Sequence, residues 1–509
     1  MAIKGKNPIN KKKLFYLIFF SVLIFSIFLR VHDIYNFTTF SGEEGYDLEI
    51  VKKIITAGDF TLLGPKSGPY NNLVQLYLGP LYYYLILPAL FLFHLDPIGP
   101  AYFSAFLSIC TVVLVFLIGK TVFKNSFVSL FPMAIFGFSP IMVDQARSSS
   151  PAYYVPFFSG LLLYSLLKIQ KNSKYFFWIF LGGALGSLIQ LHYSTLFLFP
   201  VVGLFFLLNR EKFKLKYFLL ALLTFFIVIS PLLLFEVRNK FFITKSFFTQ
   251  LVFSGHFFAL SKILFSLKNS ISSLTYLLVP LKNNVIEFTI PVLLLVFFFI
   301  SKISLKKEKE TRKSSIDKII LFLACWLVIN IIFLFFFPGE IQTHYYNASV
   351  CSILIFETAL FFYFSKYQEK IAIGIMILFA AVNLFSNRFS ADNGNSMAKG
   401  WNLKGVKKAS EIIAKDPGTD KKFNVAATLD GDTRARPYRY FLDLAHKIPQ
   451  DVENYPDSQV LYLIARDEEN RIRSYTVWEV AVFAPFKIDK KWEIQNGIKL
   501  YKLVKPEKK

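Results

Sequence analysis

The chain has 509 residues, of which 54% are hydrophobic and 18% aromatic, and its formal net charge is +23. A soluble protein of this length could not bury so much apolar surface, and repeated apolar runs long enough to cross a bilayer indicate a polytopic α-helical membrane protein. The positive charge is explained by lysines that keep loops in the cytoplasm, so nucleic acid is not an expected partner.

The first apolar run covers 14–30 and follows a basic segment that ends at Lys13. The residues after it, "RVHDIYNF", contain no A-x-A-like cleavage site, which favours a retained anchor over a removed signal peptide. With the basic end in the cytoplasm, the chain emerges on the outer side as a first external loop over 31–100. This loop contains "SGEEGYDLE", in which Glu43 and Glu44 stand between two glycines.

The run 76–93 carries Pro80, Pro88 and a group of four tyrosines. Proline weakens a continuous span and tyrosine favours the membrane–water interface, so we expect this segment to lie at the outer interface. About eleven transmembrane helices remain, and they become twelve if 76–93 crosses. They are expected at 14–30, 101–118, 126–142, 152–167, 175–190, 195–208, 217–235, 284–300, 317–337, 347–364 and 371–386.

This arrangement sorts the loops into two chemical classes. Basic segments fall on the cytoplasmic side at 119–125, 168–174, 209–216, 301–315 and 365–370. Polar clusters gather on the outer side: "SGEEGYDLE", "DQARSSSP", "QLHYS", "FEVRNK" and "PGEIQTHYYN". The stretch 236–283 is also expected outside, with room for an interfacial helix. A site that faces the extracytoplasmic space would show this convergence of polar groups.

The chain changes character after about residue 387. "FNVAATL", "QVLYLIA" and "IKLYKLV" are typical of strands, whereas "VKKASEIIAKD" and "RPYRYFLDLAHKI" are typical of helices. We therefore divide the chain into a transmembrane domain over 1–389 and a soluble extracytoplasmic α/β domain over 390–509.

The order of these motifs resembles the glycosyltransferases of the GT-C class, in the branch of protein O-mannosyltransferases and aminoarabinose transferases of lipid A (glycosyltransferase family 39). The likeness rests on the acidic pair after the first span, the helix "GYDLEIVKKIITAGDF", the segments "LLGPKSGP" and "GPLYYYLILPALFLF", and the external "ARSSSP". The family usually has Asp-Glu as its acidic pair. Here Glu43 holds the aspartate position and Glu44 the glutamate position.

The resemblance implies an enzyme that moves a sugar from a polyprenyl-phosphate carrier to a lipid, glycan or protein acceptor on the outer side of a prokaryotic plasma membrane. It also implies inversion at the anomeric carbon and a first-loop acid that activates the acceptor. Glu43 is the candidate base, because a carboxylate in a partly dry site can accept the hydroxyl proton. Glu44 is the candidate to orient it, bind the acceptor or help hold a metal. The alternative is that one acid caps the helix near Gly45.

Three external cations are candidate substrate-binding residues: Arg147, Lys66 and Arg238. A leaving lipid phosphate needs its charge stabilised, and arginine offers paired hydrogen bonds to phosphate. Arg147 is favoured by its family-like position. The alternative is an interfacial anchor or a structural ion pair, such as Arg238 with Glu236.

A second candidate group for substrate binding lies at outer span ends: His192, Tyr193, His344 and Tyr345. Histidine with Glu340 and Glu44 could hold a divalent metal, as some relatives do, but no tight ligand spacing is present, so ordinary hydrogen-bonded interfacial residues are favoured. Aromatic rings could stack on sugars, and an interfacial tyrosine belt is the default interpretation.

Two other functions remain open from the sequence. A multi-pass transporter or lipid-linked-sugar flippase would show broken helices and polar groups at mid-membrane, whereas the polar groups here gather outside, which favours the enzyme. A catalytically inactive scaffold with a partner-binding C-terminal domain is the other alternative, since glutamate replaces the usual aspartate at position 43.

Overall fold

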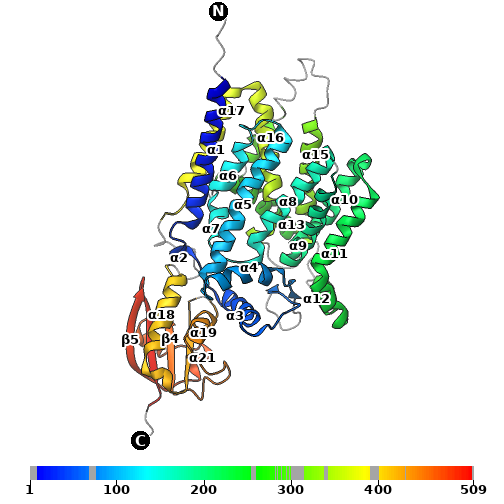
Figure 1. The fold of residues 1–509 in the computed structure, drawn as a ribbon. Coiled ribbons are helices and arrows are strands. Elements are labelled where there is room, and N and C mark those ends of the chain that lie inside the picture. Colours follow the sequence, from blue (N-terminus) through cyan, green and yellow to red (C-terminus); the bar gives the residue numbers. More distant parts are fainter. Residues whose placement is uncertain are drawn as a thin grey trace, which may run out of the picture.

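A computed structural model describes residues 8–67, 76–172, 174–253, 260–280, 283, 285–287, 289–293, 295–296, 299, 315–336, 342–389, 400–429 and 431–506. In Figure 1 a bundle of helices carries the N-terminus at one end and a separate sheet domain with the C-terminus at the other end. The predicted fold class, a helical membrane protein with a C-terminal α/β domain, is confirmed.

The helices of the first part are α1 (Pro8–Val31), α2 (Ile34–Phe37), α3 (Gly42–Ala57), α4 (Leu81–Leu92), α5 (Ile98–Phe123), α6 (Leu130–Phe138), α7 (Pro140–Ala146), α8 (Pro151–Lys171), α9 (Tyr175–Leu191), α10 (Leu198–Leu208), α11 (Leu215–Arg238), α12 (Phe242–Phe253), α13 (Leu260–Leu278), α15 (Ser315–Phe336), α16 (Val350–Tyr367) and α17 (Glu369–Phe385). Short 3-10 turns η1 (Tyr193–Phe197), η2 (Arg210–Lys212) and η3 (Thr343–Ser349) join some of them. Two short strands, β1 (Lys66–Ser67) and β2 (Leu76–Tyr77), pair antiparallel in the first external loop.

Six helices in the described part of the chain are long and apolar enough to cross a membrane: Lys11–Val31, Ile98–Phe123, Pro151–Lys171, Leu215–Arg238, Asp317–Phe335 and Thr343–Phe364. Shorter apolar helices cover Leu81–Leu92, Tyr175–Leu191 and Tyr193–Leu208. The expected number of eleven spans is not confirmed, and the predicted span at 284–300 is described only in part, at residues 285–287, 289–293, 295–296 and 299.

Helix α4 stands where the sequence predicted an interfacial segment. It has 12 residues, so it extends about 18 Å at 1.5 Å per residue, well short of the roughly 30 Å hydrocarbon core. Strand β2 occupies the start of the predicted segment and ends before Pro80. The length of α4 therefore supports the interfacial interpretation over a twelfth span.

The predicted single span at 126–142 differs from the structure. Two helices, α6 and α7, replace it, and they meet at Ser139, whose backbone leaves the helical region (φ −59°, ψ 119°). The reason is Pro140, which cannot donate the next helical hydrogen bond. The break turns the chain so that α7 carries the external "DQAR" residues.

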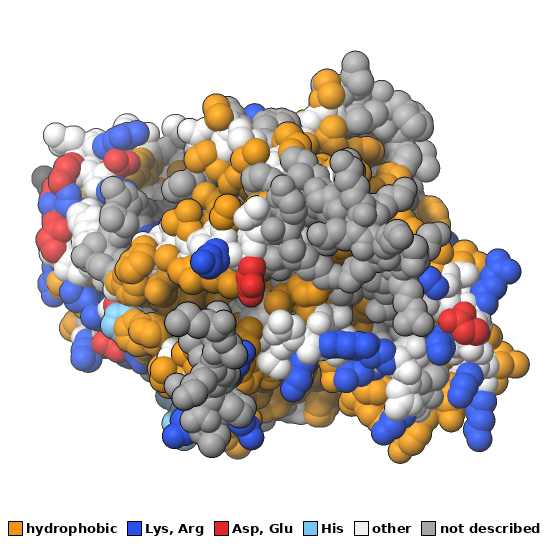
Figure 2. All heavy atoms as spheres, turned by 90° about the horizontal axis from the view of Figure 1, so that it is seen from above, with side chains coloured by type: hydrophobic (Ala, Val, Ile, Leu, Met, Phe, Trp, Pro, Cys, Tyr) orange, Lys and Arg blue, Asp and Glu red, His pale blue; other side chains and the backbone are white. Residues whose placement is uncertain are grey.

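Basic helix ends converge at the end of the bundle away from the sheet domain. Lys171 Nζ donates a hydrogen bond to the carbonyl oxygen of Thr121, and Gln170 Nε2 donates to Asn209 Oδ1 at 3.1 Å, so the ends of α5, α8 and α10 meet. Figure 2 looks onto this end and shows lysine and arginine side chains spread across it. The exposed cations of these helix ends are Lys120, Lys124, Lys171, Lys174, Arg210, Lys214 and Lys216.

The C-terminal domain contains one four-stranded sheet with the order β3-β4-β6-β5. Its elements are α18 (Leu403–Lys415), η5 (Pro417–Asp420), β3 (Phe423–Ala427), α19 (Arg436–Leu444), β4 (Val460–Ala465), α20 (Glu469–Ile472), α21 (Trp478–Ala481), β5 (Lys487–Gln495) and β6 (Ile498–Val504). Strands β3 and β4 are parallel and fully buried, and the β4–β6 and β6–β5 pairs are antiparallel. Strand β5 is the exposed, lysine-rich edge, which suits a strand that must not pair with other chains.

Hydrogen bonds fasten this domain to the first loop of the chain, residues 31–100. The backbone N–H of Leu403 donates to the Thr38 carbonyl at 2.9 Å, and Asn402 Nδ2 donates to the Asn36 carbonyl at 2.8 Å. From α19, the Tyr440 hydroxyl donates to the Leu95 carbonyl at 2.7 Å. The sheet domain and the first loop therefore form one docked unit at one end of the bundle.

The two ends of the bundle should face opposite sides of the membrane. We expect a cysteine in place of Ile448, which is 73% exposed on the C-terminal domain, to react with a membrane-impermeant thiol reagent from outside the cell. A cysteine in place of Lys124, at the end of α5, should react only after permeabilisation. Both variants are made with Cys110, Cys325 and Cys351 replaced by alanine.

Labelling of both positions from the same side of intact cells would contradict this topology. The parent protein without cysteines is the control for background reaction.

Candidate active site

Helix α3 begins with a capping box that uses Glu44. Ser41 is the N-cap, Glu44 Oε2 accepts the Ser41 backbone N–H at 2.7 Å, and the Glu44 backbone N–H points to Ser41 Oγ at 3.4 Å. The carboxylate also accepts a backbone hydrogen bond from Ser149. Such a reciprocal cap fixes the first helical turn. The alternative that one acid caps the helix is therefore right for Glu44.

Glu43 occupies the same turn with a different role. Its side chain is exposed, whereas Gly42 and Gly45 on either side of the pair are buried. The helix N-terminus favours negative charge there, since its first N–H groups point outward along the axis. Of the two acids, Glu43 is the one that a substrate can approach.

The C-terminal domain covers the two glycines. A Cβ atom at Gly42 would lie 2.4 Å from the Cβ of Asp432, and one at Gly45 would lie 3.0 Å from the backbone nitrogen of Pro437. The Arg436 guanidinium lies 5.0 Å from the centre of the Tyr46 ring. Glycine on both sides of the acidic pair thus lets the start of α19 pack directly against the start of α3.

Two ionic contacts hold this interface. Lys52 of α3 pairs with Asp443 of α19. Further along the loop, Lys407 Nζ lies 2.7 Å from Asp96 Oδ2, which also accepts the Tyr35 hydroxyl at 2.7 Å. All of these groups are partly exposed, so their main effect is to fix the orientation of the domain.

A third carboxylate on α3, Asp47, was not among the residues predicted from the sequence. It is 7% exposed, and its Oδ1 accepts the Tyr83 hydroxyl at 2.7 Å. Burial raises the pKa of Asp47 to about 8, against the effect of the Tyr83 hydrogen bond and with the charges of Glu43 and Glu44 adding to it. Burial likewise raises the pKa of Glu44 to about 7. The spacing of four residues from Glu43 to Asp47 was the sequence signal for a shared helix face.

The segment 147–149 joins the acidic pair to Arg147. The Arg147 carbonyl accepts the Thr38 hydroxyl at 2.9 Å, and Ser149 donates to Glu44. Arg147 is 2% exposed, and its guanidinium stacks 3.8 Å from the centre of the Phe37 ring. Its Nε and Nη1 atoms have no hydrogen-bond partner among the residues that the structure describes.

Charged groups of both signs lie within electrostatic range of this guanidinium. Arg147 interacts electrostatically with Asp144, Arg388 and Asp33, and Asp144 is already paired with Arg388 at 3.0 Å. Burial lowers the pKa of Arg147 to about 10, so the group stays charged at neutral pH. A buried, charged donor with open N–H groups suits an anionic ligand.

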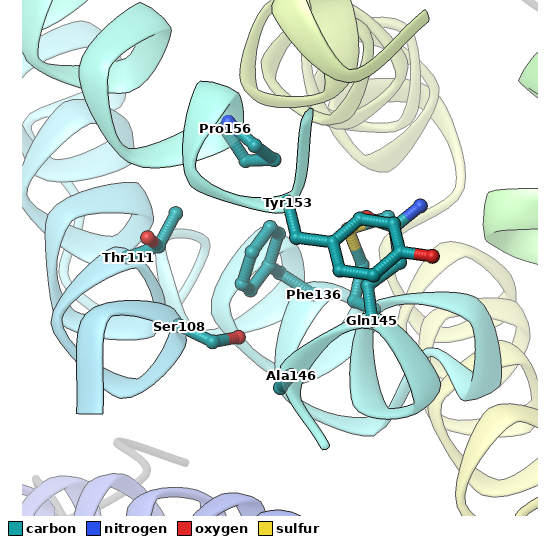
Figure 3. Close-up of a pocket in the computed structure, with 8 residues that line it drawn as sticks. Ser108, Thr111, Phe136, Gln145, Ala146, Tyr153 and Pro156 are labelled. Atoms are coloured by element: carbon teal, nitrogen blue, oxygen red, sulfur yellow. The ribbon is translucent and has the colours of Figure 1, made fainter. Parts of the chain in front are cut away.

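Tyrosine and serine side chains pack behind the acidic pair. The Ser149 hydroxyl lies 2.9 Å from the Tyr82 hydroxyl and 3.0 Å from that of Tyr154, and Tyr153 lies within electrostatic range of Glu43, Glu44 and Asp144. Tyr153 and Gln145 also line a small cavity beside α7 (Figure 3). The outer clusters "SGEEGYDLE" and "DQARSSSP" are thus brought together, as predicted.

The glycines of the "LLGP" and "GPLYYYL" segments seat the first loop on the bundle. A Cβ at Gly64 would lie 2.0 Å from the carbonyl oxygen of Gly79, and one at Gly79 would lie 2.4 Å from the Gln190 side chain. The Gly79 N–H donates to the Gln190 carbonyl at 3.1 Å. Glycine at positions 64 and 79 therefore allows the backbone of the loop to pack closely, which explains why both segments contain glycine.

The predicted histidine cluster forms, without Tyr193. The His192 ring centre lies 5.2 Å from that of His344 and 5.1 Å from that of Tyr345. Tyr193 instead packs with Leu76 and Ile243, and its hydroxyl donates to the Tyr77 carbonyl. Within the described part of the chain, no three His, Cys, Asp or Glu residues are placed to hold a metal ion, and Glu340 lies outside it.

The remaining two cations lie apart from this group. Lys66 is exposed on β1, 5.9 Å from the Tyr77 ring centre, and Arg238 is exposed at the end of α11. Glu236, the suggested partner of Arg238, instead binds backbone at the start of α12, where it accepts the N–H groups of Ile243 at 2.8 Å and Thr244 at 3.0 Å.

The raised pKa of Asp47 makes stability depend on pH. Because the folded state holds the Asp47 proton more tightly than the unfolded chain does, stability should fall as the pH rises from about 4 to about 8. Asp47→Asn can still accept the Tyr83 hydrogen bond and has no proton to lose. We expect this variant to match the wild type in thermal unfolding near pH 4 and to become increasingly more stable than the wild type as the pH rises to 8.

Glu49→Gln is the matched control, since Glu49 is exposed on the same helix. A pH profile of Asp47→Asn parallel to that of the wild type would show that folding does not raise the pKa of Asp47.

Comparison with known proteins gives a consistent picture. Residues 78–235 match the family model for dolichyl-phosphate-mannose-protein mannosyltransferases. An uncharacterized protein of Aquifex aeolicus is 24% identical over 211 residues, which are 41% of this chain and 41% of that protein, so the match spans about two fifths of the relative's length.

Three solved structures share the arrangement of the chain. ArnT from Cupriavidus metallidurans matches with a TM-score of 0.57 in the apo state (10% identity, 97% of this chain and 98% of that chain) and 0.56 when bound to undecaprenyl phosphate (11% identity, 98% of each chain). The apo oligosaccharyltransferase of Archaeoglobus fulgidus matches with a TM-score of 0.52 (14% identity, 93% of this chain and 72% of that chain). The predicted resemblance is confirmed: this chain has the fold of the GT-C class of membrane glycosyltransferases and is similar to the protein mannosyltransferases over residues 78–235.

Proposed function

We propose that the protein is an inverting glycosyltransferase that moves a sugar from a polyprenyl-phosphate carrier to an acceptor, with Glu43 as the base. The observation that carries the proposal is that an exposed carboxylate, Glu43, and a buried and incompletely bonded guanidinium, Arg147, lie at the same end of a membrane bundle, linked through Glu44 and the 147–149 segment. ArnT, one of the proteins of similar fold, has been solved with undecaprenyl phosphate bound.

The chemical step needs a negative group at the acceptor hydroxyl and a positive group at the leaving phosphate. The acceptor hydroxyl loses its proton to the Glu43 carboxylate while its oxygen forms a bond to the anomeric carbon. The bond from that carbon to the phosphate oxygen breaks, and the electron pair leaves with the polyprenyl phosphate. Arg147 binds the departing phosphate and stabilises its charge. One displacement from the face opposite the leaving group inverts the anomeric carbon.

The two acids divide the work in this scheme. Glu44 fixes the first turn of α3 through Ser41 and Ser149, so it is a positioning residue for Glu43. Glu43, exposed beside it, touches the acceptor. This division explains why the two acids are adjacent. A base must be held rigidly to keep a hydroxyl in line for attack, and Glu44 fixes the helical turn that carries Glu43.

The other predicted residues are assigned contacts away from the reacting atoms. His192, His344 and Tyr345 form an aromatic cluster suited to a sugar or lipid headgroup, while Lys66 and Arg238 meet lipid headgroups at the surface. Tyr193 contacts the first loop through the hydrogen bond from its hydroxyl to the Tyr77 carbonyl. A divalent metal stays a proposal without an assigned step, because the described residues do not form a metal site.

The sheet domain is proposed to face the extracytoplasmic space of a prokaryotic plasma membrane, with the N-terminus in the cytoplasm. The basic helix ends at the opposite end of the bundle support this orientation. The acceptor, a lipid, glycan or protein, would reach Glu43 beside the start of α19.

Replacement of Glu43 tests the base. Glu43→Gln keeps the shape of the side chain and cannot accept the proton, so we expect single-turnover transfer at saturating donor and acceptor to fall by about two to four orders of magnitude. Glu43→Asp should retain more activity than Glu43→Gln. Purified protein with radiolabelled sugar on candidate lipid donors gives the measurement.

Two further variants separate base from cap. Glu44→Gln should lower both activity and thermal stability, because it weakens the capping box, whereas Glu49→Gln should leave both unchanged. Near-normal turnover by Glu43→Gln with loss in Glu44→Gln would move the base to Glu44. Normal turnover in both would remove this helix from the chemistry.

Replacement of Arg147 tests phosphate binding. Arg147→Ala should raise the KM for the lipid donor more than the KM for the acceptor, and Arg147→Lys should recover part of the loss because it keeps the charge without the fork. Arg210→Ala, at the other end of the bundle, is the control. Unchanged donor kinetics in a folded Arg147→Ala protein would exclude Arg147 from the donor site.

A further inference from the structure

The break between α6 and α7 leaves backbone carbonyl groups without helical partners. The Ile135 carbonyl still accepts the Ser139 N–H at 2.9 Å. The next carbonyl, that of Phe136, would pair with residue 140, but proline has no N–H to give. In a membrane bundle, water is scarce and a freed carbonyl must find a donor within the protein.

Arg30, in the last turn of α1, supplies donors to this break. Its Nη2 donates to the Phe136 carbonyl at 3.2 Å, and its Nη1 donates to the Gly137 carbonyl at 2.7 Å and to the Ser26 carbonyl at 3.1 Å. Its Nε donates to Ser108 Oγ on α5 at 2.8 Å. Arg30 is 0% exposed, and these four acceptors are three carbonyls and one hydroxyl rather than a carboxylate.

The third carbonyl of the break also has a side-chain donor. Asn387 Nδ2 donates to the Phe138 carbonyl at 2.6 Å. The following residue, Arg388, pairs with Asp144 on α7 at 3.0 Å. Side chains of α1 and of the segment after α17 therefore hold both sides of the break, and α7 leads from it to Arg147.

A small cavity lies against α7 on the side that faces α5 (Figure 3). Its volume is about 10 Å³, about the space that one water molecule needs. Ser108 and Thr111 lie on one side of it in Figure 3, with Tyr153 and Gln145 on the other. Packing against α5 is incomplete here, so the hydrogen bonds at the break have a larger share in fixing α7.

We infer that Arg30 is a positioning residue of the donor site: it holds the break at Pro140 so that α7 presents Arg147 to the phosphate of the lipid-linked sugar. This inference rests on the proposed function. It explains why a charged side chain is buried in the first span with its hydrogen bonds directed to backbone and hydroxyl oxygens. Buried charge in a span is costly and is kept where it serves a function.

Arg30→Met in the full-length protein tests the inference with two measurements. Amide hydrogen exchange of residues 139–147 should become faster than in the wild type, because α7 loses its anchor. The KM for the lipid donor should rise about tenfold or more, as expected for a misplaced binding group, while kcat changes by less than about threefold. Partial misfolding would instead lower the apparent kcat at an unchanged KM.

Matched variants separate this role from a general loss of packing. Thr111→Val removes a buried hydroxyl from the same cavity, one that bonds to its own helix at the Leu107 carbonyl. We expect it to behave like the wild type in both measurements. Arg30→Lys should be intermediate. If Arg30→Met does not assemble in the membrane, Asn387→Ala, which frees the Phe138 carbonyl, should give the same changes with smaller size.

The outcomes distinguish this inference from the proposed function. Wild-type exchange at 139–147, or faster exchange with an unchanged donor KM, would overturn the positioning role of Arg30. A wild-type protein that transfers no sugar and does not bind undecaprenyl phosphate as a probe would overturn the proposed function and the donor-site role together. Faster exchange in that case would still establish Arg30 as the anchor of α7.

Discussion

The close approach of two backbones, that of α3 and that of the start of α19, is the constraint on which this end of the molecule depends. Gly42 and Gly45 leave no room for a side chain, because Asp432 and Pro437 occupy the space. A Cβ at Gly42 would overlap the Asp432 side chain, and a Cβ at Gly45 would crowd the backbone at Pro437. The acidic pair between these glycines is therefore held at a junction of two domains, where one wall belongs to the membrane part and the other to the soluble part.

A second constraint lies inside the bundle, at the break between α6 and α7. Pro140 ends α6, and α7 follows toward the end of the bundle that carries the sheet domain. The carbonyls freed at the break are bonded by Arg30 and Asn387. A bent path in a membrane is stable only when each freed backbone group has a donor. The bend in turn sets where Arg147 begins its contact with Phe37 and the first loop.

The sequence predicted what depends on local pattern. The apolar runs and strands β3, β4 and β6 follow from hydropathy, and the predicted segment 76–93 contains α4 over 81–92. Of the predicted polar clusters, "SGEEGYDLE" and "DQARSSSP" lie together at one end of the bundle. Strand β5 was missed because "KIDKKWEIQ" has only three apolar residues among six charged or polar ones, as suits an exposed edge. Asp47 was visible by its helical spacing from Glu43, but its burial against Tyr83 depends on a contact between α3 and α4. The role of Arg30 depends on helices more than 100 residues apart.

The neighbouring acids Glu43 and Glu44 differ in burial, which the sequence alone does not reveal. Glu44 and Asp47 have raised pKa values because they lie in a partly dry layer between α3, α4 and the 147–149 segment. A protonated or fully bonded carboxyl in that layer is suited to holding a helix turn in place. Glu43 points to the exposed side of the same turn, where an acceptor hydroxyl can reach it. The first turns of α3 therefore hold Glu44 and Asp47 on the bonded face and leave Glu43 exposed, next to the start of α19.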